Sequence, residues 1–124
     1  MIHGIGVDIV EIERIAYIYN RYKERFLHRI LHTQEYSSMP TTQVDIFLAS
    51  RFAVKEAFVK ALGTGFRDGI SFRDIATVKD KLGSPRLLLD GIAKEYYDSL
   101  GIHYAHLSLS HEASYTVAMI ILER

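Results

Sequence analysis

The order of the elements that the sequence predicts indicates an α+β fold in which an antiparallel sheet packs against a long helix. Helical patterns fill most of the first half of the chain and strand patterns most of the second half. This separation favours α+β over an alternating α/β arrangement. The chain has 124 residues, of which 48% are hydrophobic, so it is most simply one domain, 1–124, with a buried core. A lone strand pattern at the N-terminus has to join the later sheet.

The first half of the chain predicts one strand followed by helices. In chain order, the expected elements are a strand at 2–8, helical pieces to about Leu31, a short helix at 34–38, a loop at 37–42 and a long helix that ends at Leu62. Asp45 is expected to cap the start of the long helix, and Gly63 and Gly65 to stop it.

The second half predicts strands with one short helix between them. The expected elements are strands at 71–79 and 85–89 joined by a turn at 80–84, a helix at 91–100, and strands at 104–110 and 115–123. Only His111–Ser114 separates the last two strands, so they predict a long C-terminal hairpin.

Composition argues against several functional classes. The chain has 15 basic and 15 acidic residues and a pI near 7.0, unlike the strongly basic surface of most nucleic-acid-binding proteins. It contains no cysteine, which excludes disulfides, thiolate metal sites and cysteine nucleophiles. The N-terminus does not resemble a signal peptide, and no apolar stretch reaches the ~18 residues that span a bilayer. We therefore expect a cytoplasmic protein that binds neither nucleic acid nor a membrane.

The most informative segment is the helix predicted around 51–63, which is built almost entirely of apolar and small residues. Glu56 and Lys60 lie four positions apart and so share one face, and Phe52 and Val59 flank Glu56 at helical spacing. An acid among large apolar side chains is costly to keep charged unless a partner such as a metal ion compensates it.

Asp8 is a second candidate ligand, at the end of the apolar run Ile5–Val7. One interpretation is a helix N-cap, because Glu11 follows three residues later. The other is a ligand for a hard divalent cation, which prefers carboxylate oxygens. Both are compatible with one carboxylate. Asp8, Glu56 and Lys60 together make a plausible site for a divalent cation and a phosphate.

Other features of the long helix have ordinary explanations as well as functional ones. Glu56 and Lys60 are compatible with a simple surface ion pair of ~0.3–0.5 kcal/mol. Gly63–Gly65 is compatible with a helix C-cap or with a phosphate cradle, although it lacks the ending of a P-loop. A stripe of small residues at Ala53, Ala57 and Ala61 predicts close packing against another element.

The histidines and the first helices supply the remaining candidates. His28 and His32 are four residues apart with no third metal ligand nearby, so we expect surface or partly packed side chains. His111 stands at a strand end, where binding groups often occur, although a structural role in the turn is the more ordinary explanation of the sequence. Between Arg14 and His32, five basic residues accompany one acid, which fits either a solvated face or a patch for an acidic partner.

Several motifs occur in a fixed order along nearly the whole chain. They are Gly4–Asp8 with Glu11 and Arg14, Phe26–Leu31 with Glu35, Phe47–Gly65, Ser71–Ile75, Gly83–Pro85 and Leu107–His111. Because it carries these motifs in this order, the chain resembles the holo-acyl-carrier-protein synthases, which are bacterial 4′-phosphopantetheinyl transferases. The resemblance implies the fold of that family and its reaction, in which the 4′-phosphopantetheine arm of coenzyme A moves onto a serine of apo acyl carrier protein and adenosine 3′,5′-bisphosphate leaves.

The resemblance also implies roles for individual residues. It places Mg²⁺ on Asp8 and Glu56, bridged to the pyrophosphate of coenzyme A, and brings Lys60 to the same phosphates as the third catalytic residue. The implied coenzyme-binding residues are Arg51, Lys60, Pro85 near the adenine and His111, and Gly63 is added as a candidate phosphate contact. Arg14 and Arg21 match the surface that receives the acidic carrier protein. Relatives of this length are homotrimers with sites at subunit interfaces. The chemistry agrees with the residues, because phosphoryl transfer needs alignment and charge neutralisation more than a special nucleophile.

Two departures from the family pattern lead to further expectations. His32 stands where the family has Thr, which predicts a weaker cap for the short helix that follows. The loop Pro40–Val44 lacks the basic residues that relatives carry near the 3′-phosphate of coenzyme A, which predicts a weaker contact with that phosphate.

Two other functions use the same residues. The first is a Mg²⁺-dependent hydrolase of a nucleotide or phosphodiester, with water as nucleophile on the same two carboxylates. The second is a non-catalytic trimeric module that binds an acidic partner through its first helix.

Overall fold

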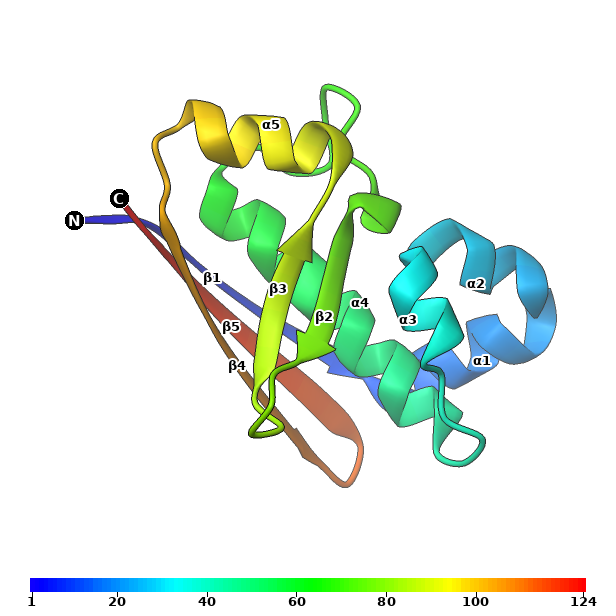
Figure 1. The fold of residues 1–124 in the computed structure, drawn as a ribbon. Helices are drawn as coiled ribbons and strands as arrows, with labels where there is room; N and C mark the ends of the chain where they lie inside the picture. Colours follow the sequence, from blue (N-terminus) through cyan, green and yellow to red (C-terminus); the bar gives the residue numbers. More distant parts are fainter.

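The computed structural model describes residues 1–124 and contains two antiparallel sheets and five α-helices (Figure 1). The strands are β1 (Ile2–Glu11), β2 (Ile75–Lys79), β3 (Pro85–Leu89), β4 (Tyr104–Glu112) and β5 (Tyr115–Glu123). The helices are α1 (Ile12–Tyr22), α2 (Glu24–Ile30), α3 (Thr33–Ser37), α4 (Val44–Leu62) and α5 (Gly91–Ser99), with a short 3₁₀ turn at Phe72–Asp74. The α+β fold with an antiparallel sheet on a long helix is thus confirmed.

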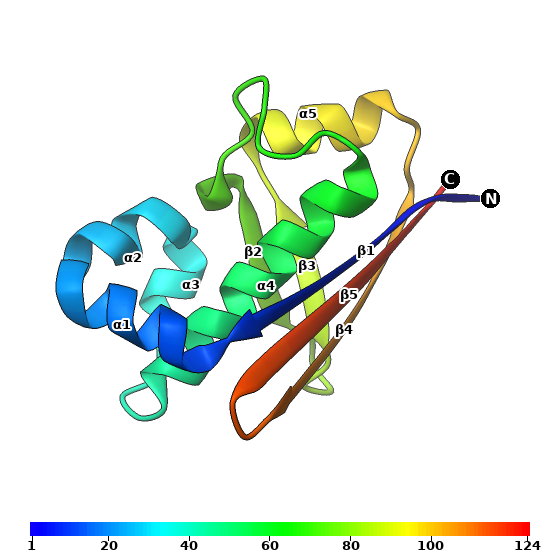
Figure 2. The same cartoon turned by 180° about the vertical axis from the view of Figure 1, so that it is seen from behind.

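Helix α4 forms the centre of the molecule (Figures 1 and 2). Its side chains are apolar on nearly every face, and most of them are buried, as expected for a helix surrounded by other elements. The three-stranded sheet, in the order β1–β5–β4, runs along one flank of α4, and the β2–β3 pair lies on another flank. Helices α1 to α3 gather near the N-terminal end of α4.

Strand β1 lies unusually close to α4 because two of its inward-facing residues are glycines. A Cβ atom on Gly4 or Gly6 would overlap the backbone carbonyl oxygen of Ala61 or Ala57. The small-residue stripe predicted on the long helix therefore does pack closely against another element. The same register places Asp8, two residues beyond Gly6, on the inward side of β1 and next to α4.

Two predicted helix caps are wrong. Strand β1 continues through Asp8 to Glu11, since it pairs with β5 as far as Glu11 opposite Tyr115. Helix α1 therefore begins at Ile12, after Glu11 and without a side-chain cap. At α4 the N-cap is Gln43, in a left-handed conformation, and Asp45 lies within the first turn. Pairing with β5 extends the strand past the point at which the local sequence favours a helix.

The remaining strands follow the sequence closely. The β4–β5 hairpin forms as predicted, and β1 joins the sheet beside β5, with Val7 opposite Met119. The strand expected to begin at Ser71 begins at Ile75 instead, because the Ser71 hydroxyl accepts a hydrogen bond from the backbone N–H of Arg73 and holds a 3₁₀ turn. None of the helices combines the length with the apolar character that a membrane-spanning segment requires.

The outer face of the three-stranded sheet is apolar and uncovered. Ile5, Val7 and Ile9 alternate along β1, and they are 57%, 49% and 62% exposed. Met119 lies opposite Val7 on β5 and is also exposed. A contiguous apolar surface of this kind is characteristic of an interface between proteins.

Candidate active site

Asp8, Glu56 and Lys60 come together where β1 crosses α4. The ammonium group of Lys60 donates to Oδ1 of Asp8 at 3.1 Å and to the backbone carbonyl of Val7 at 3.0 Å. Lys60 therefore links the helix to the strand, and it does not form the ion pair with Glu56 that the four-residue spacing allowed. The carboxylate of Asp8, free of any capping role, points into this cluster.

The pKa of Glu56 is raised even though two basic groups lie beside it. Partial burial, and then the negative charge of Asp8, raise the pKa of Glu56, while Lys60 and Arg14 oppose the shift. Arg14 projects from α1, so three elements contribute charge to the same small region. Two carboxylates held near each other favour a bound cation.

The donor set suits Mg²⁺ better than a metal that requires a complete protein cage. No group of three or more histidine, cysteine or acidic side chains is arranged to hold a metal ion, so Asp8 and Glu56 are the ligands that this cluster offers. Mg²⁺ keeps several waters and binds through one or two carboxylates plus substrate phosphates. The residues present therefore fit that ion together with a phosphorylated substrate.

A buried ion pair occupies a different face of α4. Lys55 and Glu35 are each 1% exposed, and the Lys55 ammonium donates to Oε1 of Glu35 at 2.7 Å. Glu35 also accepts hydrogen bonds from the backbone N–H groups of His32 and Thr77, at 3.1 and 3.0 Å. Burial lowers the pKa of Lys55 and Glu35 opposes that shift. This pair joins α3, α4 and β2.

The pair was not predicted from the sequence, although its signal was present. Lys55 is a charged residue in the middle of an apolar helix, like Glu56. Glu35 belongs to one of the sequence motifs that occur in a fixed order along the chain. Only the orientation of the helix distinguishes the two charged faces. The expected weak cap at His32 is wrong for a related reason: Nδ1 of His32 accepts from the backbone N–H of Gln34 at 3.0 Å, so His32 replaces Thr as the cap of α3.

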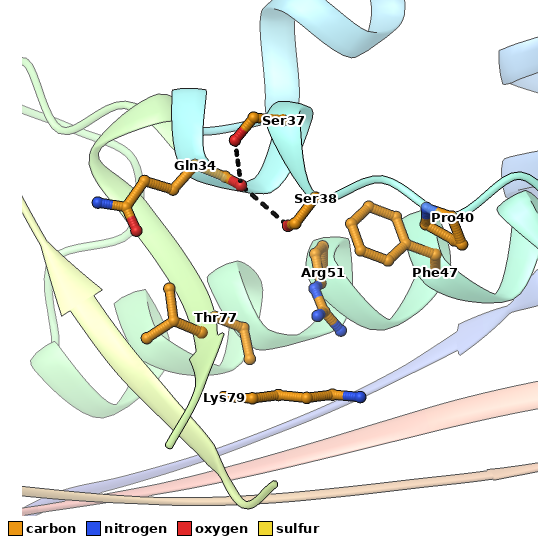
Figure 3. A pocket seen from close by; sticks show the side chains of 9 residues that line it. Gln34, Ser37, Ser38, Pro40, Phe47, Arg51, Thr77 and Lys79 are labelled. Carbon is orange, nitrogen blue, oxygen red and sulfur yellow. Dashed lines mark hydrogen bonds between the residues drawn. The ribbon is translucent and has the colours of Figure 1, made fainter. Parts of the chain in front are cut away.

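Arg51 lines a pocket of about 700 Å³ between α3, α4 and β2 (Figure 3). Its guanidinium stacks on the ring of Phe47 at 4.4 Å, and Nη1 donates to the hydroxyl of Ser50 at 3.3 Å. Nε lies 3.8 Å from Oε2 of Glu35, too far for a hydrogen bond. Thr77 and Lys79 of β2 also line the pocket, and neither was singled out by the sequence.

The other expected coenzyme-binding residues lie apart from Asp8. Pro85 begins β3, opposite Lys79 on β2. His111 lies on β4 opposite Thr116, with an exposed side chain. Gly63 ends α4 in the left-handed conformation, with φ of 92°.

The Gly63–Gly65 segment behaves as a helix C-cap. The backbone N–H groups of Gly63, Thr64 and Gly65 all donate to the carbonyl of Val59, at 3.0, 3.3 and 3.4 Å. Those donors are therefore occupied within the chain, and a phosphate near Gly63 would have to be held by other groups. The space beside Gly63 is open, because a Cβ atom added there would meet no other atom within 4 Å.

Arg14 and Arg21 both lie on α1 and are exposed. Arg21 packs beside the ring of Tyr22, at 5.5 Å. An apolar groove of about 470 Å³ opens next to this helix, between α1, α2 and α4, with Tyr22 and Phe52 on its walls and Arg25 and Arg29 also lining it. The sequence predicted the basic residues but not the groove.

Within one chain the structure separates the expected site residues into two groups. Arg51 and Glu56 are five positions apart on α4, so their side chains point about 140° apart around the helix axis. Asp8, Glu56, Lys60 and Arg14 lie on the side of β1, and Arg51 lies on the side of β2.

Comparison with known proteins identifies the family. A sequence model described as the 4′-phosphopantetheinyl transferase superfamily matches residues 4–120. The holo-[acyl-carrier-protein] synthase of Nitratidesulfovibrio vulgaris strain DP4 is 50% identical over 123 residues, which cover 99% of both chains. The chain belongs to the 4′-phosphopantetheinyl transferase superfamily.

Solved structures of such transferases agree with the fold described above. The holo-[acyl-carrier-protein] synthase of Neisseria meningitidis superposes with a TM-score of 0.94 at 38% identity, covering 100% of both chains. The Helicobacter pylori synthase, solved in complex with coenzyme A, gives a TM-score of 0.84 at 34% identity and covers 96% of this chain and 99% of its own. These matches confirm the family resemblance and the phosphopantetheinyl transferase fold expected from the sequence.

Proposed function

We propose that this transferase moves the 4′-phosphopantetheine group of coenzyme A onto a serine of apo acyl carrier protein and releases adenosine 3′,5′-bisphosphate. This is the activity of a holo-[acyl-carrier-protein] synthase, the name carried by relatives that match the chain over its whole length. The observation that carries the proposal is the convergence of Asp8, Glu56 and Lys60 between β1 and α4. The reaction supplies the carrier for fatty acid biosynthesis.

Each of these three side chains has a defined task. Asp8 and Glu56 would hold Mg²⁺, which, when bound, neutralises the pyrophosphate of coenzyme A and stabilises charge that develops on the leaving bisphosphate. Lys60, anchored on Asp8 at 3.1 Å, lies within reach of the same phosphates. Arg14 adds a second positive charge beside Glu56. Alignment and charge neutralisation are the main requirements of phosphoryl transfer.

The carrier protein docks on α1 in this proposal. Arg14 and Arg21 are exposed on that helix and suit an acidic partner. The apolar groove beside Tyr22 and Phe52, with Arg25 and Arg29 also lining it, offers a surface for an apolar side chain between charged contacts. Docking there would bring the acceptor serine toward Glu56, because Phe52 lies one turn from Glu56 on α4.

The working enzyme in this proposal is a homotrimer with its sites between subunits. The uncovered apolar face at Ile5, Val7 and Ile9 supports association. The separation of Arg51 from Glu56 around α4 supports sites shared between copies, because one chain presents the two groups in different directions. Sedimentation equilibrium measures the assembly, and a monomer at micromolar concentration would contradict it. The cytoplasmic location remains a prediction.

Intact-mass analysis of a carrier protein tests the reaction itself. Apo acyl carrier protein incubated with the enzyme, coenzyme A and Mg²⁺ gains the mass of one phosphopantetheine group. Release of adenosine 3′,5′-bisphosphate without carrier would instead identify a hydrolase that uses the same carboxylates. Binding of the carrier without any turnover would identify a non-catalytic module.

A further inference from the structure

His32 joins two segments of the chain that are 58 residues apart. It precedes α3, and its Nε2 lies 2.5 Å from Oδ2 of Asp90, the residue before α5. On the other side of the ring, Nδ1 accepts a hydrogen bond from the backbone N–H of Gln34 at 3.0 Å. The residue is only 7% exposed. Both ring nitrogens are therefore engaged, and their partners are of opposite kinds.

These two partners determine which ring nitrogen of His32 carries the proton. A backbone N–H can only donate, so Nδ1 is the nitrogen without a proton, and a carboxylate accepts, so Nε2 carries it. A second proton, on Nδ1, would set two donors against each other and break the bond to Gln34. The bond to Asp90 would become an ion pair. Thr, which the family carries at this position, has no such second state.

The charged groups around the ring come from several elements. A polar cavity of about 350 Å³ beside the ring is lined by His32, Thr33, Ser71, Arg73 and Asp74. Glu35 of α3 accepts from the backbone N–H of His32, and Lys55 of α4 counters its charge at 2.7 Å. Asp90 is the only acid bonded to the ring. The ring can therefore take up a proton from solvent through the cavity, while Asp90 holds it in place in either state.

Helix α3 depends on its cap more than a long helix would. It has five residues, little more than one turn, and so short a helix is not stable by itself. Gln34, Ser37 and Ser38 of this helix line the pocket at Arg51 (Figure 3). Loss of the cap would therefore loosen one wall of that pocket and leave the cluster on the other face of α4 in place.

We propose that His32 is a positioning residue that holds α3 at the pocket only while its ring carries a single proton, so that this enzyme binds coenzyme A more weakly in acid. The inference rests on the proposed function, which supplies coenzyme A as the substrate. Histidine is the side chain that changes charge between about pH 5 and pH 8. Because His32 acts through α3 and touches none of the proposed catalytic residues, the KM for coenzyme A changes and kcat does not.

Two variants imitate the two states of the ring. His32→Asn keeps an acceptor for the N–H of Gln34 and cannot gain a proton, whereas His32→Gln extends toward Asp90 and lacks the Nδ1 acceptor. The measurement is the KM for coenzyme A in carrier modification between about pH 5.5 and pH 8. At the alkaline end we expect the wild type to match His32→Asn, and His32→Gln to have a KM about fivefold higher, as for the loss of one helix cap. In acid the wild type is expected to approach His32→Gln.

His103→Asn is the matched control, because His103 is exposed before β4 and does not line the pocket. It is expected to follow the wild type at every pH, and kcat is expected to be the same in all four proteins at a given pH. Comparing the proteins at one pH removes the ionisation of coenzyme A and of the other histidines, which all four share. Ratios of KM that do not vary with pH would overturn the inference and leave the proposed function intact.

Nuclear magnetic resonance of the histidine rings gives a readout that does not depend on activity. The His32 signals, assigned by their loss in His32→Thr, are expected to show a proton on Nε2 alone at about pH 8. A proton on Nδ1 at that pH would contradict the inference, even if His32→Gln failed to fold. Melting temperatures check the folding of each variant. If the wild type transfers no phosphopantetheine at any pH, the proposed function fails, and the resonance experiment still tests the ring.

Discussion

Two faces of helix α4 bring a lysine next to acid side chains, yet the two sets of charges are built in opposite ways. Lys55 and Glu35 are buried, 2.7 Å apart, and surrounded by backbone donors and acceptors. Lys60, Asp8 and Glu56 are partly exposed, and the pKa of Glu56 is raised by burial and by its acidic neighbour. A charge cluster whose hydrogen bonds are complete stabilises a fold, whereas a partly exposed cluster with two neighbouring carboxylates is suited to binding a cation.

The largest expected effect concerns the buried pair. Lys55→Met leaves the Glu35 carboxylate buried without its counter-charge, which costs about 3–5 kcal/mol of unfolding free energy. Urea denaturation of the variant measures this loss. Adding Glu35→Gln, which removes the uncompensated charge, is expected to recover part of the stability. Full stability of Lys55→Met would show that the pair does not hold α3, α4 and β2 together.

Variants in the cluster of Asp8, Glu56 and Lys60 are expected to lose activity while keeping their stability. Asp8→Asn and Glu56→Gln each remove a charged ligand while keeping the shape of the side chain. We expect losses of at least about 100-fold in the rate of carrier modification, since even outer contacts of a metal site contribute 10–100-fold. Thermal melts serve as the control and are expected to stay close to that of the wild type. Near-normal rates for both variants at limiting Mg²⁺ would remove the metal assignment.

The raised pKa of Glu56 predicts a pH dependence with a definite sign. Because the pKa is higher in the folded protein than in the unfolded chain, folding is accompanied by tighter proton binding between the two values. The stability of the metal-free protein therefore falls as the pH rises from the ordinary carboxylate pKa through the raised one. Glu56→Gln removes this loss.

Melting temperatures in a metal chelator between pH 4 and pH 8 check this sign. At neutral pH the Glu56→Gln variant is expected to melt at or above the wild type, and the advantage is expected to shrink in acid, where Glu56 is protonated in both states. A difference between the two proteins that does not change with pH would contradict the electrostatic account of Glu56.

The smallest effect is expected on the exposed surface of α1. Arg21→Glu weakens the encounter with an acidic carrier, so the KM for the carrier rises several-fold and the gap from the wild type narrows with added salt. Arg14→Glu is expected to cost more, since Arg14 also acts on Glu56. Carrier kinetics that are unchanged in both variants would assign these arginines to a solvated helix face.

The sequence predicted the fold and grouped Asp8, Glu56 and Lys60 into one candidate site, but it did not show that Arg51 lies on a different face of α4. The apolar setting of Glu56 and the motif at Gly4–Asp8 were sufficient to select the carboxylates, because both signals are local. The cap assigned to Asp8 was wrong because pairing with β5, a contact across the whole chain, extends β1. The pair of Lys55 with Glu35 needed the rotation of α4 relative to β2, which no local pattern supplies.

The pocket at Arg51 shows the same limit. Arg51 was expected to bind the coenzyme, but Thr77 and Lys79 come from a strand that the sequence placed only by its β-propensity. Their common cavity depends on how β2 lies against α3 and α4. Nε of Arg51 and Oγ1 of Thr77 are buried without a hydrogen-bond partner, and the sequence could not reveal this because it depends on packing.

Binding of Mn²⁺, a spectroscopic substitute for Mg²⁺, tests the central claim most directly. Electron paramagnetic resonance reports the free ion as it is titrated with the enzyme and coenzyme A. The control variant is Lys81→Gln, which changes an exposed residue in the turn between β2 and β3. The account predicts that the wild type and Lys81→Gln bind the ion in the presence of coenzyme A, and that Asp8→Asn and Glu56→Gln bind it at least about tenfold more weakly. Equal binding by all four proteins would contradict the assignment of the metal to Asp8 and Glu56.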